Sequence, residues 1–327
     1  MATRPLIEVR NLTKRFVRRA GLLSLLSGRR HQVHALNGVN FAVARGETLA
    51  IVGESGCGKS TLARCLVRLH EADGGDIEYD GVDVRTLSGH ALRQYNRRVQ
   101  MVFQDPYGSL NPRQTVARQL GEPIRVHRIR PPGEIDARVR ELLDLVRLPA
   151  EAAQRYPHAF SGGQRQRIGI ARALSLEPEC LVADEPVSSL DVSVQAQIIN
   201  LLLELQERLR LTVVFVSHDL RVVRHLAHRV AVMYLGRVVE LGETEQIFRR
   251  PRHPYTAALI AAAPSLDFER RGTTEAVVGE LPSALSIPAG CAFHPRCPHA
   301  IDRCRREVPR EETSPEGHVV ACHLPLG

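Results

Sequence analysis

The sequence has no apolar run long enough to cross a lipid bilayer. A membrane-spanning helix needs roughly 18 to 20 consecutive apolar residues, and the longest candidate, AALIAAAP, is far shorter. The first residues, MATRPLIEVR, lack the features of a secretory signal and lead directly into a strand-like pattern. We therefore expect a cytosolic chain, whose role at a membrane would depend on a membrane-embedded partner.

Blocks of like charge, internal repeats and low-complexity tracts are also missing. The 44 Lys and Arg residues and the 36 Asp and Glu residues interleave along most of the chain. The resulting net charge of +8 is compatible with nucleic acid, a membrane surface or phosphorylated ligands, and does not choose among them. With 327 residues, 43% of them hydrophobic, the chain can form one large α/β domain plus a small appendage, or two modest domains.

The sequence lacks a C-x2-C pair, although four of its seven cysteines crowd into the last 37 residues. These four are Cys291, Cys297, Cys304 and Cys322, spaced C-x5-C-x6-C-x17-C. In a reducing compartment such a cluster indicates a metal site more than disulfides. The spacing gives a zinc ribbon little support, whereas four thiolates suit a [4Fe–4S] cluster. Zinc and unligated thiols remain alternatives.

Hydrophobic periodicity predicts an alternation of strands and helices, and therefore an α/β fold. The runs LIEVRNLTKRF, TLAIV, CLVAD and TVVFVS predict strands, and VQAQIINLLLELQERL predicts a helix between the last two. The pattern is mostly helical from about residue 114 to residue 176. After about residue 264 the chain becomes rich in Pro, Arg and Cys, so we place a domain boundary there.

A glycine-rich motif, GESGCGKST, follows TLAIV and precedes a helical pattern. It matches G-x-x-x-x-G-K-[ST], and the strand-to-helix context makes the match specific. Its glycines let successive N–H groups form an anion nest at the positive end of the following helix. Lys59 supplies a charge for the β- and γ-phosphates, and the Ser60 hydroxyl is a natural Mg²⁺ ligand. The residues predicted to contact nucleotide are Gly53, Glu54, Ser55, Gly56, Cys57, Gly58, Lys59, Ser60 and Thr61.

Two adjacent carboxylates end the apolar pattern CLVAD. A buried strand that ends this way is costly unless the carboxylates have a role. We predict that Asp184 holds Mg²⁺ through water and that Glu185 orients or deprotonates the attacking water. His218 follows TVVFVS, where α/β sheets place ligand contacts, and is interpreted as a γ-phosphate contact. Gln104 ends VQMVFQ and is interpreted as a contact of Mg²⁺ or water. The predicted catalytic residues are Glu185, His218 and Gln104, and the predicted Mg²⁺ residues are Ser60, Gln104 and Asp184.

A second glycine-rich turn, SGGQ, opens another helical pattern at Ser161. The ordered series of phosphate loop, Gln104, SGGQ, LVADEP, the SSLD turn and His218 resembles the ATP-binding subunits of ABC transporters. The resemblance covers roughly residues 5 to 265, with the minor departure that Phe160 stands where leucine is commoner. The resemblance implies that Phe16 stacks on adenine and that Asp191 relays between two sites. It also identifies the signature turn, which comprises Ser161, Gly162, Gly163 and Gln164.

The resemblance implies a P-loop NTPase fold in which two chains pair head to tail. ATP on the phosphate loop of one chain would be capped by the SGGQ turn of the other. The ABC ATPase core would occupy residues 1–264, with a helical subdomain at about 105–177, and a small Cys-rich extension would occupy residues 265–327.

The C-terminal region, with HPYTAALIAAAP and IPAGCAFHPRCPHAIDRC, resembles the tail of oligopeptide and dipeptide importer ATPases. This implies an ATP-hydrolysing subunit, peripheral on the cytoplasmic face of the inner membrane, that powers peptide import. Its partners would be a second ATPase subunit, identical or distinct, two permease subunits and an extracytoplasmic solute-binding protein. The resemblance also points to a structural [4Fe–4S] cluster at the four cysteines.

Two other functions remain open. Nickel or another solute could replace peptides as the cargo, because nickel importers share much of the pattern. A soluble ABC ATPase acting on nucleic acid is less favoured, because such proteins usually carry two cassettes or a long insertion. We therefore expect no nucleic-acid partner.

Overall fold

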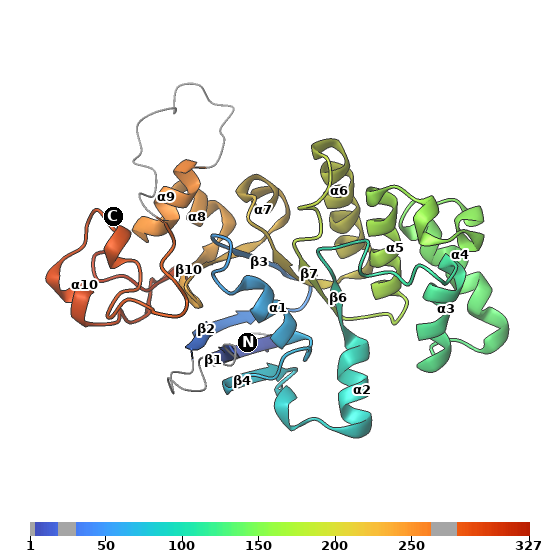
Figure 1. Cartoon of the computed structure of the whole chain (residues 1–327), viewed down its shortest axis with the longest axis horizontal. Helices are drawn as coiled ribbons and strands as arrows, with labels where there is room; N and C mark the ends of the chain where they lie inside the picture. The colour runs from blue at the N-terminus through green and yellow to red at the C-terminus, as the bar shows by residue number, and fades with distance from the viewer. Residues whose placement is uncertain (1–3, 19–30, 263–279) are drawn as a thin grey trace, which may run out of the picture.

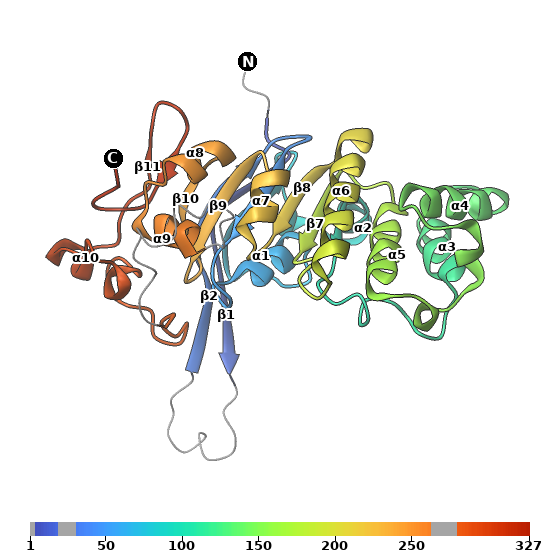
Figure 2. The same cartoon turned by 90° about the horizontal axis from the view of Figure 1, so that it is seen from above.

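The structure is a computed structural model that describes residues 4–18, 31–262 and 280–327. Within these residues the main sheet has the strand order β11-β12-β10-β9-β3-β8-β7-β6, and Figures 1 and 2 together label most of these strands. Its parallel strands are β3 (Thr48–Val52), β6 (Val99–Val102), β7 (Cys180–Asp184), β8 (Thr212–Val216) and β9 (Arg229–Tyr234). Strands β3, β7 and β8 are buried along their whole length, as expected for short apolar runs in a parallel sheet covered on both faces.

A smaller antiparallel sheet lies beside the main one. It has the order β2-β1-β4-β5, with bounds β1 (Ile7–Arg18), β2 (His31–Val43), β4 (Gly74–Tyr79) and β5 (Val82–Asp83). Figures 1 and 2 show both sheets in the middle of the molecule. The α/β class is as predicted.

Helices pack around the main sheet and also form a separate group at one end. The helices along the sheet are α1 (Lys59–Leu66), α2 (Gly89–Arg98), α6 (Val192–Leu209), α7 (Leu220–Leu226), α8 (Thr244–Arg249) and α9 (Pro254–Ala262). The group at the end comprises α3 (Val116–Val126), α4 (Ile135–Leu145) and α5 (Gly162–Leu174) (Figures 1 and 2). Among the described residues, none of the helices combines the length and the apolar character needed to cross a membrane.

The C-terminal segment continues the main sheet. Its strands are β11 (Glu312–Thr313) and β12 (Val319–Val320), and the segment also contains η7 (His294–Arg296) and α10 (Asp302–Arg306). Strand β12 pairs antiparallel with β10 (Arg237–Glu243), so that Val320 lies opposite Glu240. The predicted domain boundary after residue 264 falls in 263–279, outside the described residues, and stays a prediction.

A buried carboxylate fastens this segment to the core. Glu240 has no exposed surface, and its oxygens accept hydrogen bonds from the backbone N–H groups of Arg252 and His253 at 2.6 and 2.9 Å. Nε2 of His318 lies 2.7 Å from Oε1 of the same carboxylate. The carboxylate therefore holds strand β10, the start of α9 and the C-terminal segment together.

Candidate active site

The phosphate loop connects β3 to α1 and can adopt its path because of its glycines. At Gly53, φ is 150° and an added Cβ would lie 2.3 Å from the carbonyl oxygen of Met233, so the loop packs directly on the end of β9. Lys59 is 4% exposed, and its Nζ donates to the carbonyl oxygens of Gly53 and Glu54 at 2.8 and 3.0 Å. The lysine charge is therefore held inside the loop that is predicted to cradle phosphates.

Two of the three residues predicted to bind Mg²⁺, Ser60 and Asp184, are in contact. Oγ of Ser60 donates to Oδ1 of Asp184 at 2.9 Å. Burial raises the pKa of the Asp184 carboxyl, and the hydrogen bond from Ser60 opposes this effect. An oxygen-rich pair at the end of a buried strand suits a hard divalent cation.

Two of the predicted catalytic side chains contact the carboxylate of the third, Glu185. Nε2 of Gln104 donates to Oε2 of Glu185 at 3.1 Å, and Nδ1 of His218 lies 3.3 Å from the same oxygen. Glu185 has φ of 44°, which is uncommon for a residue with a side chain, and its N–H donates to the carbonyl of Val216 at 3.0 Å. The strand ends of β6, β7 and β8 therefore gather these groups at one edge of the sheet.

A cavity of about 300 Å³ lies at this edge. The predicted residues that line it are Phe16, Ser55, Gly56, Gly58, Lys59, Ser60, Thr61, Gln104 and Glu185. The Phe16 ring stands nearly perpendicular to the His70 ring at a centroid distance of 5.3 Å.

The cavity wall includes three residues that the sequence reasoning missed, namely Val33, Ala35 and Ala284. The alternation of Val33 and Ala35 along β2 is a signal that could have placed both on one face of the strand. Ala284 comes from the C-terminal segment, and its carbonyl accepts the N–H of His34 at 2.9 Å. No local pattern in the sequence indicates this contact.

The signature turn is not among the residues that line this cavity. Ser161 caps α5 in a reciprocal arrangement, in which its Oγ accepts the N–H of Gln164 and its own N–H donates to Oε1 of Gln164. A Cβ at Gly163 would lie 2.4 Å from Cγ1 of Val194, so this glycine permits close contact between α5 and α6. Asp191, which precedes α6, also lies outside the cavity lining.

The four clustered cysteines line a second, very small cavity of about 10 Å³. They share it with His294, His299 and His323, and the cysteines form no disulfides. Burial raises the pKa of the Cys322 thiol to about 11. In the part of the chain that the structure describes, no group of three or more His, Cys, Asp or Glu side chains is arranged to hold a metal ion.

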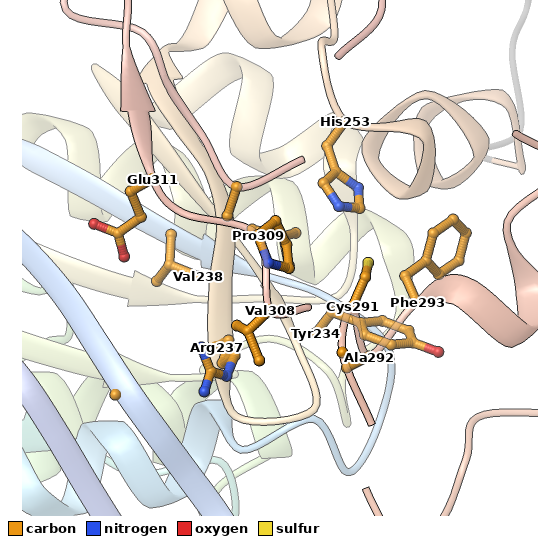
Figure 3. Close-up of a pocket in the computed structure, with 14 residues that line it drawn as sticks. Tyr234, Arg237, Val238, His253, Cys291, Ala292, Phe293, Val308, Pro309 and Glu311 are labelled. Carbon is orange, nitrogen blue, oxygen red and sulfur yellow. The ribbon is translucent and has the colours of Figure 1, made fainter. Parts of the chain in front are cut away.

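One polar atom at the edge of this cavity is buried without a hydrogen-bond partner among the described residues. Nδ1 of His253 accepts the N–H of Tyr255 at 3.0 Å, so the neutral ring carries its proton on Nε2, which has no partner. Figure 3 shows the His253 ring and the Cys291 sulfur directed toward one another. A buried donor without a hydrogen-bond partner is costly.

The fold and the site define a nucleotide-hydrolysing P-loop ATPase of the ATP-binding cassette type. Residues 36–188 match the ABC transporter family, and residues 239–304 match the C-terminal region of oligopeptide/dipeptide transporters. The chain belongs to the ABC transporter family of ATP-binding proteins and carries the C-terminal region of its oligopeptide/dipeptide branch.

Curated relatives and solved structures are similar over most of the chain. The probable peptide ABC transporter ATP-binding protein y4tS of Sinorhizobium fredii is 51% identical over 98% of this chain and 90% of its own length. The oligopeptide transport ATP-binding protein AppF of Bacillus subtilis is 49% identical over 98% of this chain and 97% of its own length. The structure of cbiO1 from Clostridium perfringens covers 76% of this chain and 92% of its own, with a TM-score of 0.64 and 29% identity. The cassette MJ0796, in a dimer bound to ADP and Pi, covers 73% of this chain and 98% of its own, with a TM-score of 0.63 and 30% identity.

Proposed function

We propose that this ATPase powers the import of peptides through a separate membrane permease. The observation that carries the proposal is that similarity to peptide transport subunits extends over nearly the whole chain, including the C-terminal region. The subunit would sit on the cytoplasmic face of the inner membrane. It would work with a second ATPase subunit, two permease subunits and an extracytoplasmic solute-binding protein.

The phosphate loop and the side chains at the strand ends would have separate roles in this mechanism. The backbone N–H groups of the phosphate loop and Lys59 would bind the phosphates. Glu185 would orient the attacking water and take its proton, while Gln104 and His218 hold the carboxylate in place. Mg²⁺, held by Ser60, Asp184 and Gln104, would neutralise charge on the β- and γ-phosphates.

The separation of the signature turn from the cavity supports a site shared between two chains. Ser161, Gly162, Gly163 and Gln164 lie outside the cavity that contains Lys59, so within one chain they do not form part of its wall. In a head-to-tail pair they would cap the partner's nucleotide, with Asp191 between the two sites. ATP would then stabilise the closed pair, and loss of the γ-phosphate would release it.

Uptake of labelled peptides tests the proposed cargo. Deleting the gene should abolish ATP-dependent uptake of di- and oligopeptides, and the wild-type gene should restore it while Lys59→Ala should not. Unchanged peptide uptake in the deletion strain would contradict the proposal. Loss of nickel uptake alone would favour the alternative cargo, and co-purification with nucleic acid in place of two membrane proteins would favour a soluble ATPase.

The four cysteines remain our proposed site for a [4Fe–4S] cluster. The chemistry of the ligands suits such a cluster, because four thiols line one cavity. The unpartnered Nε2–H of His253 could donate a hydrogen bond to a sulfur. The group would be held by Cys291, Cys297, Cys304 and Cys322, and it would supply a structural cross-link. Iron and acid-labile sulfide should both be present in anaerobically purified protein. Zinc alone, or neither metal, would overturn the proposal.

A further inference from the structure

The second residue of the phosphate loop is held by two side chains from the C-terminal part of the chain. Nη1 and Nη2 of Arg296 donate to Oε2 and Oε1 of Glu54 at 2.9 and 3.0 Å, which makes a two-point ion pair. The backbone N–H of Glu54 donates to the hydroxyl of Tyr255 at 2.9 Å. Arg296 ends η7, and Tyr255 lies in α9.

The ion pair is largely shielded from solvent and lies beside a group of packed aromatic rings. The Arg296 side chain is 7% exposed and that of Glu54 is 24% exposed. The guanidinium lies 5.9 Å from the centroid of the Tyr234 ring at the end of β9. Tyr234 in turn packs against Tyr255 and Phe293 at centroid distances of 4.7 and 5.3 Å, and Figure 3 shows Tyr234 and Phe293 together where the C-terminal segment meets the core. A planar fork fixed in this way restrains both position and direction of the carboxylate.

Glu54 lies where such a restraint acts on nucleotide-binding groups. The carbonyl oxygens of Gly53 and Glu54 accept the two hydrogen bonds from Nζ of Lys59. The next residues, Ser55 and Gly56, line the nucleotide cavity. A shift of Glu54 would therefore move the lysine that is expected to meet the phosphates and change the direction of the following N–H groups.

We propose that Arg296 is a positioning residue for the phosphate loop, acting through Glu54 and assisted by Tyr255. Arg296 and Tyr255 together form an arm from the C-terminal part of the chain, and this arm sets how tightly the core binds ATP. This inference depends on the ATP site alone, and stays testable whether or not the cargo is a peptide and whether or not the cysteines hold a cluster.

A double-mutant cycle on the full-length chain tests the proposal. The variants are Arg296→Met, Glu54→Gln and the two combined, and the readout is the Kd of a fluorescent ATP analogue. We expect each single variant to bind roughly five- to tenfold more weakly, at the lower end of typical site-to-site coupling, and the combined variant to be no weaker than either. Arg303→Met is the matched control, because Arg303 is in the same segment and forms an exposed pair with Glu307.

Two outcomes would overturn the proposal. Unchanged ATP affinity in Arg296→Met would show that the arm does not act on the loop. Additive losses in the combined variant would show that Arg296 acts on the nucleotide by another route. In steady-state ATPase assays, KM should rise more than kcat falls, and Arg296→Lys should be intermediate because it keeps the charge and loses the fork.

A milder variant keeps the proposal testable if Arg296→Met does not fold. Tyr255→Phe removes only the hydroxyl that accepts the Glu54 N–H, and its ring can still pack on Tyr234. We expect a roughly two- to fivefold weaker affinity for the ATP analogue. Wild-type affinity in Tyr255→Phe, with the same thermal stability, would also contradict the proposed role of this arm.

Discussion

At the scale of single residues, Glu185 is the side chain on which we expect the chemistry to depend most. It is held in a left-handed backbone conformation and contacts both Gln104 and His218. Such a conformation costs free energy and persists only where the surroundings fix it. The backbone conformation of Glu185 and its contacts with Gln104 and His218 therefore fix the direction of the Glu185 carboxylate.

Glu185→Gln should lower kcat for ATP hydrolysis by about a hundredfold or more, because an amide cannot accept the proton of the attacking water. ATP binding should be kept, and ATP should trap a closed dimer that is visible by size-exclusion chromatography. Glu204→Gln is the control, because Glu204 lies on α6 and forms an exposed ion pair with Arg147. Normal turnover in Glu185→Gln would refute the catalytic assignment.

At the scale of elements, the signature turn lies where the start of α5 packs against α6. Gly163→Ala places a methyl group against Val194, and we expect it to lower the free energy of unfolding by about 1–3 kcal/mol through overpacking. Combining it with Val194→Ala should restore stability in chemical denaturation. If the signature turn caps a partner's nucleotide, the combined variant should still have reduced ATPase activity. Full activity would argue against that role for Gly163.

The short helix α7 directly follows His218 and begins at a charged cap. Oδ1 of Asp219 accepts the N–H of Arg221 at 2.9 Å, and the hydrogen bond from the Arg221 side chain holds the pKa of Asp219 below its usual value. Asp219→Ala should lower the free energy of unfolding by about 1 kcal/mol at pH 7.

The pH dependence of this loss follows from the lowered pKa. The folded state favours the ionised carboxylate, so its stabilisation is present above the usual Asp range and is lost as the pH falls through the lowered pKa. The stability difference between wild type and Asp219→Ala should therefore shrink below about pH 4. A difference that grows in acid would contradict the assignment.

At the scale of the whole molecule, the C-terminal extension and the core form one continuous structure. Glu240 connects them, and its replacement by Ala would leave His318 and two backbone N–H groups without their acceptor. We expect Glu240→Ala to lower the free energy of unfolding by about 3 kcal/mol, because several buried donors lose their partner together. Limited proteolysis should then release the segment after residue 280 earlier than in wild type. Glu240→Gln, which keeps an acceptor, should lose less.

Much of the site could be predicted from the sequence because its parts are local. The phosphate loop is contiguous, and the apolar runs before Asp184 and His218 identify parallel strands whose ends meet at one edge. Other parts could not be predicted. Tyr255 and Arg296 reach Glu54 across 201 and 242 residues of chain, and neither lies in a periodic pattern that indicates a partner. Strand β12 has two residues, too few for an alternation to be recognised.

The pairing of β12 with β10 has a consequence for biosynthesis. Glu240 leaves the ribosome about 80 residues before Val320, its partner in the sheet. At a translation rate of about 5–20 residues per second, the edge of β10 stays unpaired for several seconds, and during that time it could pair with another nascent chain. The edge of β10 is thus covered only after Val320 has been translated, and a product truncated before that residue would present the edge to the chaperones and proteases of the cell.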